Sequence, residues 1–145
     1  MSQERTSFVR LQRHVDARGS LSVVEHDGSL PFVPARMFWI SDVPKEAQRG
    51  GHAHWTCWEV VFAASGRFEI ELDYGDRSES FVLDRPDVGI VIPAGVWCDL
   101  RGFEENTVCV VLASEEYDAS GYVHDKMAWR VALEKEKSEK RIKDG

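Results

Sequence analysis

Short apolar runs separated by turns recur along most of the chain. Residues 67–72 alternate polar and apolar side chains, which is typical of a strand with one buried face. Runs rich in Val, Ile, Phe and Trp predict further strands over residues 20–25, 36–40, 58–64, 80–83, 88–92 and 107–112. Glycine and proline separate these runs, for example at Ser65-Gly66 and Pro93-Ala94-Gly95. Many short strands at this spacing favour an all-β sandwich or barrel.

The last part of the chain has a different pattern. Residues 125–143 contain neither glycine nor proline, and Met127, Val131 and Glu134 recur at helical spacing. Lysine and glutamate alternate near the end, as on a solvated helix face. We therefore expect a β-barrel over residues 1–125, followed by a C-terminal helix and charged tail of the same domain over residues 126–145.

Composition narrows the class of protein. Of the 145 residues, 43% are hydrophobic and 30% are charged, which is ordinary for a globular domain. No apolar run approaches the ~20 residues of a membrane span, and the first ten residues lack the apolar core of a signal peptide. Three cysteines without regular spacing favour a reducing cytoplasm over a disulfide framework. With a net charge of −7, we expect neither nucleic acid nor a membrane as partner.

Arginine supplies most of the positive charge in the body of the chain. It accounts for 12 of the 18 basic residues, and Lys45 is the only lysine before residue 126. The guanidinium group binds phosphate and carboxylate groups in a bidentate manner better than an ammonium group does. Two explanations remain open: the codon preference of a G/C-rich genome, and arginines that line a site for an anionic ligand.

Two histidines stand out as candidates for chemistry. His52 and His54 follow Gly50-Gly51 and precede an apolar run. Because side chains two apart on a strand lie on the same face, both imidazoles can point into the interior of a barrel. Imidazole titrates near neutral pH and also binds metals. The pair therefore indicates either proton transfer or metal binding.

The spacing around this pair resembles the first motif of the cupins, small jelly-roll barrels. The motif His-x-His-x4-Glu-x6-Gly is matched by His52, His54, Glu59 and Gly66. Residues 93–98 resemble part of the second motif, but Cys98 stands where that motif has histidine. The resemblance implies an all-β cupin jelly roll with a C-terminal α-helix, a fold that hosts many unrelated functions.

A narrower resemblance covers about residues 7–122. Asp16-Ala17-Arg18-Gly19-Ser20-Leu21 and Arg49-Gly50-Gly51-His52-Ala53-His54, in this order with residues 36–40 and 111–114, resemble the sugar 3,4-ketoisomerases, or WxcM-like cupins. The resemblance implies a small homodimer, often with exchanged N-terminal strands, that needs no metal or other cofactor. Its substrate would be a dTDP-4-keto-6-deoxyhexose and its product the 3-keto isomer, a precursor of 3-amino-3,6-dideoxy sugars in surface glycans such as O-antigen.

The resemblance also implies roles for individual residues. His52 and His54 would move a proton through an enediol intermediate, and the sequence does not decide which of them acts as the base. The arginines in or beside the matched segments would hold the pyrophosphate or orient the sugar; these are Arg18, Arg36, Arg49 and Arg101. Trp97 would pack on the base or sugar, whereas Tyr117 and Tyr122 could simply anchor the helix to the barrel.

Three positions depart from the family pattern and keep other functions open. Phe38 and Trp39 stand where the family has tyrosines, and Cys98 stands where it has histidine after Trp97. One alternative is a metal-dependent cupin that binds zinc or iron through His52, His54, Glu59 and Cys98. Another is a non-catalytic cupin that binds a nucleotide sugar. The Cys98 thiol is then either a reactive thiolate or an inert buried group.

Overall fold

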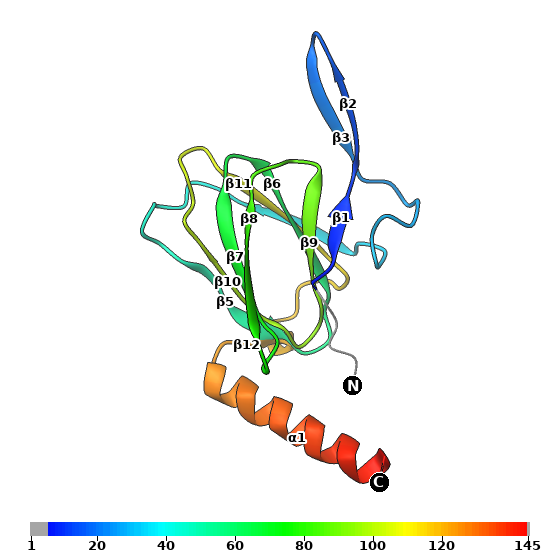
Figure 1. Cartoon of the computed structure of the whole chain (residues 1–145), viewed down its shortest axis with the longest axis vertical. Helices are drawn as coiled ribbons and strands as arrows, with labels where there is room; N and C mark the ends of the chain where they lie inside the picture. The colour runs from blue at the N-terminus through cyan, green and yellow to red at the C-terminus, as the bar shows by residue number, and fades with distance from the viewer. Residues whose placement is uncertain (1–5, 145) are drawn as a thin grey trace.

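Two five-stranded antiparallel sheets form the body of the protein (Figure 1). The computed structural model describes residues 6–144. One sheet has the order β1-β9-β6-β11-β4, with bounds Phe8–Arg10, Val88–Ile92, Glu59–Ser65, Val108–Ala113 and Arg36–Ile40. The other has the order β12-β5-β10-β7-β8, with bounds Tyr122–Val123, Arg49–His54, Trp97–Arg101, Phe68–Asp73 and Ser78–Leu83. Strands distant in sequence are therefore neighbours in both sheets.

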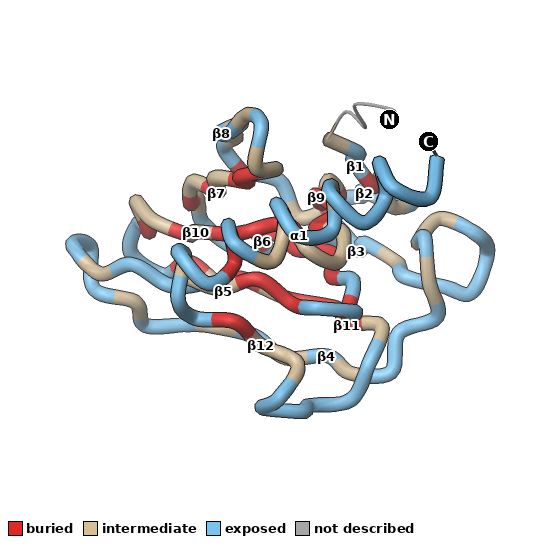
Figure 2. Tube along the Cα trace, turned by 90° about the horizontal axis from the view of Figure 1, so that it is seen from below, coloured by how far each residue is buried: buried red, intermediate tan, exposed pale blue. Residues whose placement is uncertain are grey.

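The main core lies between the inner faces of the two sheets. Strand β7 shows how the sequence produces it, because Phe68, Ile70 and Leu72 are fully buried while Glu69 and Glu71 between them are only partly buried. This is the alternation that the sequence predicts for residues 67–72. Figure 2 shows that buried residues concentrate in the central strands and that the connecting loops are exposed. The inner faces of the two sheets therefore supply the core.

The predicted all-β architecture with a C-terminal helix is confirmed. The strands expected at residues 36–40 and 88–92 have these bounds, and the other predicted strands are shifted by one to two residues at their ends. Strand β10 was not predicted because its sequence, Trp-Cys-Asp-Leu-Arg, has no continuous apolar run. Strand β12 has only two residues and follows a short 3-10 helix, Ala119–Gly121, so periodicity could not reveal it.

Helix α1, Lys126–Asp144, docks on the second sheet through its first turns. Trp129 is 0% exposed and packs with Ala53, Trp97 and Val123, while Leu133 covers the same cluster. The docked face therefore contains Trp129 and Leu133, and not Met127, which remains exposed. Asp125 caps the helix by accepting hydrogen bonds from the backbone N–H groups of residues 127 and 128. None of the helices in residues 6–144 combines the length and apolar character needed to cross a membrane.

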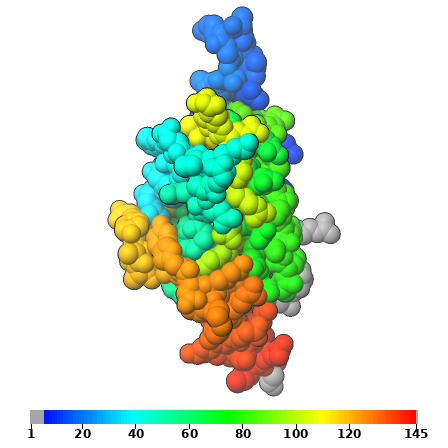
Figure 3. Space-filling model, turned by 90° about the vertical axis from the view of Figure 1, so that its left-hand side faces the viewer, coloured from blue at the N-terminus to red at the C-terminus, as the bar shows by residue number. Residues whose placement is uncertain are grey.

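A hairpin made of β2, Gln12–Asp16, and β3, Gly19–Val23, projects from the body. Its two strands pair only with each other. Val15 is 69% exposed and Leu21 is 57% exposed, so neither side chain contributes to the core of this chain. The space-filling view in Figure 3 shows the hairpin and α1 at opposite ends of the molecule.

Candidate functional site

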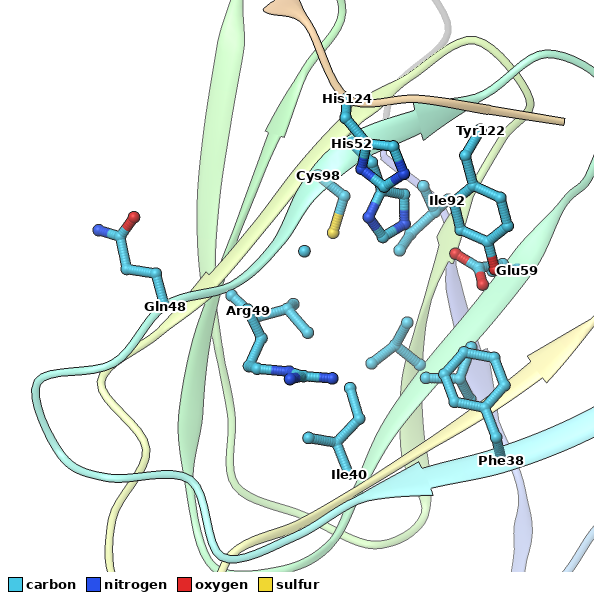
Figure 4. Close-up of a pocket in the computed structure, with 14 residues that line it drawn as sticks. Phe38, Ile40, Gln48, Arg49, His52, Glu59, Ile92, Cys98, Tyr122 and His124 are labelled. Carbon is cyan, nitrogen blue, oxygen red and sulfur yellow. The ribbon is translucent and has the colours of Figure 1, made fainter. Parts of the chain in front are cut away.

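A cavity of about 370 Å³ opens between the two sheets (Figure 4). Strands β5 and β10 supply one wall, and β4, β6, β9 and β11 supply the other. Apolar side chains and a few polar groups line it, and one of the polar groups is the buried carboxylate of Glu59. The lining residues are Phe38, Ile40, Gln48, Arg49, Gly50, His52, Glu59, Val61, Ile92, Cys98, Leu100, Val111, Tyr122 and His124. A concave, largely apolar site with a few converging polar groups is the usual form of a small-molecule site.

Two glycines allow β5 to lie close to β10 within this wall. Gly50 has a φ of +77°, and a Cβ atom there would lie 2.7 Å from the backbone oxygen of Cys98. Any other residue at position 50 would thus clash with β10 as well as strain the backbone. His52 lies opposite Cys98 next to a bulge, in which Gly51 is the extra residue of β5 between the pairs His52–Cys98 and Gly50–Asp99. The glycine pair noticed in the sequence therefore positions His52.

Four rings form a two-by-two array on the cavity side of β5 and β12. Tyr122 pairs with His54 in the strand register, with ring centres 4.2 Å apart. The ring centre of His52 lies 4.9 Å from that of His54 and 5.9 Å from that of His124. Tyr122 and His124 stack nearly parallel, with ring centres 5.7 Å apart. The His-x-His pair of one strand thus meets a Tyr-x-His pair of the other.

The two histidines of β5 have different surroundings. His52 lines the cavity, whereas His54 is buried behind it and its Nε2 atom lies 3.2 Å from Oε1 of the buried Glu59. That distance suits an ion pair, but the atoms are not aligned for a hydrogen bond, and Nε2 of His54 has no hydrogen-bond partner among residues 6–144. Of these two histidines, only His52 is placed to touch a molecule in the cavity.

Burial governs the protonation of His52. Burial lowers the pKa of His52 below its ordinary value, and the neighbouring His54 lowers it further because two adjacent imidazolium groups repel each other. The Glu59 carboxylate acts in the opposite direction, and the net direction is downward. His52 is therefore a neutral imidazole at neutral pH, which is the form that accepts a proton.

Cys98 faces the same cavity as a neutral thiol. Burial, together with the nearby Glu59 carboxylate, raises the pKa of this thiol well above its ordinary value. Of the two states considered from the sequence, the structure therefore favours the inert buried thiol over the thiolate. The donor atoms of His52, His54 and Glu59 lie within 4.8 Å of one another, and this potential metal-binding group does not include Cys98.

Two of the four predicted arginines lie at or beside the cavity. Arg49 lines it, and its guanidinium group extends over the pocket beside Ile40 (Figure 4). Arg36 donates a hydrogen bond from Nη2 to the Tyr122 hydroxyl oxygen at 3.3 Å. Its guanidinium carbon also lies 5.2 Å from the ring centre of Phe38. Arg49 therefore places a positive charge in the cavity, and Arg36 places a second one beside it, next to Tyr122.

The other predicted binding residues lie elsewhere in this chain. Arg18 sits at the exposed tip of the hairpin, where Nη2 contacts Asp16 at 2.7 Å. Arg101 pairs with Glu71 at 3.3 Å and does not line the cavity. Trp97 is buried against Trp129 and donates from its indole nitrogen to Asp99. Substrate contact by these three residues stays a prediction.

Two cavity residues were missed by the sequence reasoning. Tyr122 was considered only as an anchor for the helix, and His124 was not singled out. Their spacing of two residues is the same as that of His52 and His54, and this is the signal that could have drawn attention to them. It was weak because no apolar run marks β12 as a strand.

The chain is similar to known sugar isomerases over most of its length. The family model FdtA, described as WxcM-like, C-terminal, matches residues 4–134. A TDP-4-oxo-6-deoxy-alpha-D-glucose-3,4-oxoisomerase from Aneurinibacillus thermoaerophilus is 32% identical over 133 residues, covering 88% of this chain and 96% of that protein.

Solved structures of 3,4-ketoisomerases resemble the fold closely. A mutant of QdtA from Thermoanaerobacterium thermosaccharolyticum, in complex with TDP-4-keto-6-deoxyglucose, superimposes with a TM-score of 0.86 at 28% identity, covering 90% of this chain and 94% of that one. WlaRB, a TDP-quinovose 3,4-ketoisomerase from Campylobacter jejuni, gives a TM-score of 0.82 at 31% identity, with coverage of 88% and 98%.

Proposed function

Because the chain belongs to the WxcM-like family of sugar 3,4-ketoisomerases, it is an isomerase, and we propose that His52 carries out its proton transfer on a dTDP-4-keto-6-deoxyhexose. The observation that carries this proposal is a neutral, partly buried imidazole facing a cavity of about 370 Å³. The relative with bound TDP-4-keto-6-deoxyglucose supports this class of substrate.

The reaction needs a group that gives and takes a proton near neutral pH. The C4 carbonyl acidifies the C3 proton, so a neutral His52 removes it and an enediol forms. The protonated His52 then returns a proton at C4, while the C3 oxygen becomes the carbonyl oxygen. One such group contributes ~10²–10⁴-fold to the rate. His54, held beside the Glu59 carboxylate, lies next to the charge that His52 acquires.

Arg49 is our candidate for binding the anionic part of the substrate. Its guanidinium group reaches the pocket from the first residue of β5, and no carboxylate of residues 6–144 forms an ion pair with it that would compete with a phosphate oxygen. Arg36 stands beside Tyr122 on the opposite side of the pocket. Arg49 would thus bind the phosphate end of the substrate, whereas Arg36 would act on the site through Tyr122.

We further propose a cytoplasmic homodimer in which the β2–β3 hairpin packs on a second copy. The hairpin exposes Val15 and Leu21, and within residues 6–144 its strands pair with neither of the five-stranded sheets. Trp39, on the edge strand β4, is also exposed. Such packing would cover these apolar groups and could bring Arg18 to the partner's cavity. The three cysteines are free, which suits a reducing compartment.

Incubation with dTDP-4-keto-6-deoxyglucose in deuterated buffer tests the reaction directly. Proton NMR should show deuterium at C3 of recovered substrate and at C4 of a 3-keto product. Parallel binding measurements with dTDP, UDP and GDP would identify the preferred nucleotide. Absence of both exchange and product at high enzyme concentration would refute the proposed reaction.

A bound metal is a second candidate favoured by one observation. The donor atoms of His52, His54 and Glu59 lie close enough to share a cation, and Nε2 of His54 lacks a hydrogen-bond partner. Metal analysis of protein purified without chelator separates the two models. A stoichiometric metal that is lost in His54→Ala would replace metal-free proton transfer by a metal-dependent reaction.

A further inference from the structure

Tyr122 presents an unused hydrogen-bond donor at the cavity. Its hydroxyl oxygen accepts a hydrogen bond from Nη2 of Arg36 at 3.3 Å. Among residues 6–144 no acceptor is found for its hydroxyl hydrogen, although Tyr122 lines the cavity. A tyrosine hydroxyl usually finds a partner when it is withdrawn from water. The free hydrogen therefore suits an oxygen atom of a bound ligand.

The ring of Tyr122 is held in a defined orientation. The register of β12 on β5 places it directly opposite His54, and His124 stacks on its other side at 5.7 Å. Figure 4 shows the hydroxyl pointing away from His124 and toward the side of the pocket that contains Phe38. The hydroxyl thus enters the pocket from the same wall as His52, with ring centres 5.1 Å apart.

The isomerisation requires two proton movements, and His52 accounts for only one of them. The carbon-bound proton leaves C3 and arrives at C4. An oxygen-bound proton must also leave O3 and arrive at O4, because the carbonyl and hydroxyl groups exchange places. The two oxygens are on adjacent carbons, so one well-placed donor can serve both.

We propose that Tyr122 is a catalytic residue that carries the oxygen-bound proton from O3 to O4. This inference rests on the proposed function. When the base removes the C3 proton, the C3–H electron pair forms the C3=C4 bond and the carbonyl electron pair moves to O4. Tyr122 donates its proton to O4 and becomes a phenolate. The phenolate next removes the proton from O3, C3=O3 forms, and C4 takes its proton from His52. Tyr122 ends as it began, and no oxidant or reductant is consumed.

Arg36 is placed to support this proton transfer by Tyr122. Its guanidinium group is always charged and lies within hydrogen-bond distance of the phenol oxygen, so it stabilises the transient phenolate. Arg36 would act as a positioning residue, because it contacts Tyr122 and the aromatic rings of Phe38 and Tyr117 and does not line the cavity.

Tyr122→Phe is the direct test, because it removes one oxygen and keeps the stacked ring. We expect kcat to fall ~10²–10³-fold, as for loss of a proton donor or oxyanion partner, with little change in KM. Tyr117→Phe is the matched control. Its ring centre lies 5.8 Å from that of Tyr122, but it is 69% exposed and does not line the cavity, so we expect unchanged activity.

The outcomes separate this inference from the proposed function. An inactive wild-type protein would refute the proposed function itself. An active wild type together with a Tyr122→Phe variant within about threefold of its kcat would overturn only the role of Tyr122. If Tyr122→Phe fails to fold, fluorotyrosine at position 122 provides the test, since its phenol is more acidic. The alkaline limb of the kcat profile should then move to lower pH, and an unmoved limb would contradict the proposal.

Discussion

Two antiparallel strand pairs carry motif residues: β5 with β12, called the wall from here on, and β2 with β3, the hairpin. Helix α1 packs behind the wall, whereas the hairpin projects from the body. On the reverse face of the wall, Ala53 and Val123 are buried beneath Trp129 of α1. Among residues 6–144 the two strands of the hairpin pair only with each other, and Arg18 at its tip contacts the neighbouring Asp16. If the hairpin packs on a second copy as proposed, its motif acts through a second molecule, whereas the motif of the wall acts within one chain.

Two hydrogen bonds connect helix α1 to the strand that carries the histidines. The indole nitrogen of Trp129 donates to the backbone oxygen of Gly95 at 2.7 Å. The backbone N–H of Gly95 in turn donates to the backbone oxygen of His54 at 2.7 Å. The helix thus positions the histidine strand from behind, whereas the hairpin tip is held by the β2–β3 pairing and the contact of Arg18 with Asp16.

Removing the imidazole of the wall should have the largest effect. His52→Asn is expected to lower kcat by about 10²–10⁴-fold, since it removes the proton-transfer group but keeps a similar polar side chain. The exposed His26, beyond the hairpin, supplies the control His26→Asn, which should retain activity. Deuterium exchange at C3 is the readout. An equal loss in both variants would mean that His52 has no special role.

Removing the support behind the wall should be the next largest effect. Trp129→Ala is expected to lower the free energy of unfolding by about 3–5 kcal/mol, because it empties a fully buried indole site. Met127→Ala, on the exposed side of the same helix, should change it by less than about 0.5 kcal/mol. Urea unfolding measures both values. Similar stabilities of the two variants would show that α1 does not support the wall.

Charges on the hairpin should affect association more than the fold. The double variant Val15→Asp and Leu21→Asp is expected to produce monomers, because it places charges on apolar groups that the proposed dimer would bury. Val82→Asp, an exposed apolar position on β8, is the control and should leave the oligomeric state unchanged. Light scattering after size exclusion gives the mass. An unchanged mass for the hairpin variant would contradict the proposed interface.

The smallest effect is expected from the protonation of His52. Because its pKa in the folded protein lies below 6.5, the acid limb of kcat/KM should fall below pH 6.5. Between the folded and unfolded pKa values the unfolded chain binds more protons. The corresponding stability is therefore present above pH 6.5 and is lost as the pH falls through the folded value. Urea unfolding at several pH values should show this slope in the wild type and a weaker one in His52→Asn.

Several features of the fold and site follow from local sequence. The alternation of residues 67–72 predicted the buried side of β7, because strand periodicity depends only on near neighbours. The spacing of His52 and His54 likewise predicted two imidazoles on one face. The limits of β10 and β12 could not be predicted in this way, because these short strands are stabilised by pairing with β5 and not by their own composition.

The sequence alone determined the all-β class, the helix at the end, the histidine pair and the family, since each is encoded in short patterns of residues. Only the tertiary structure decided that His52 lines the cavity while His54 lies behind it, and that Tyr122 and His124 join them. It also placed Arg101 and Trp97 away from the cavity. These arrangements depend on which distant strands pair and which face each strand buries, and no local pattern contains that information.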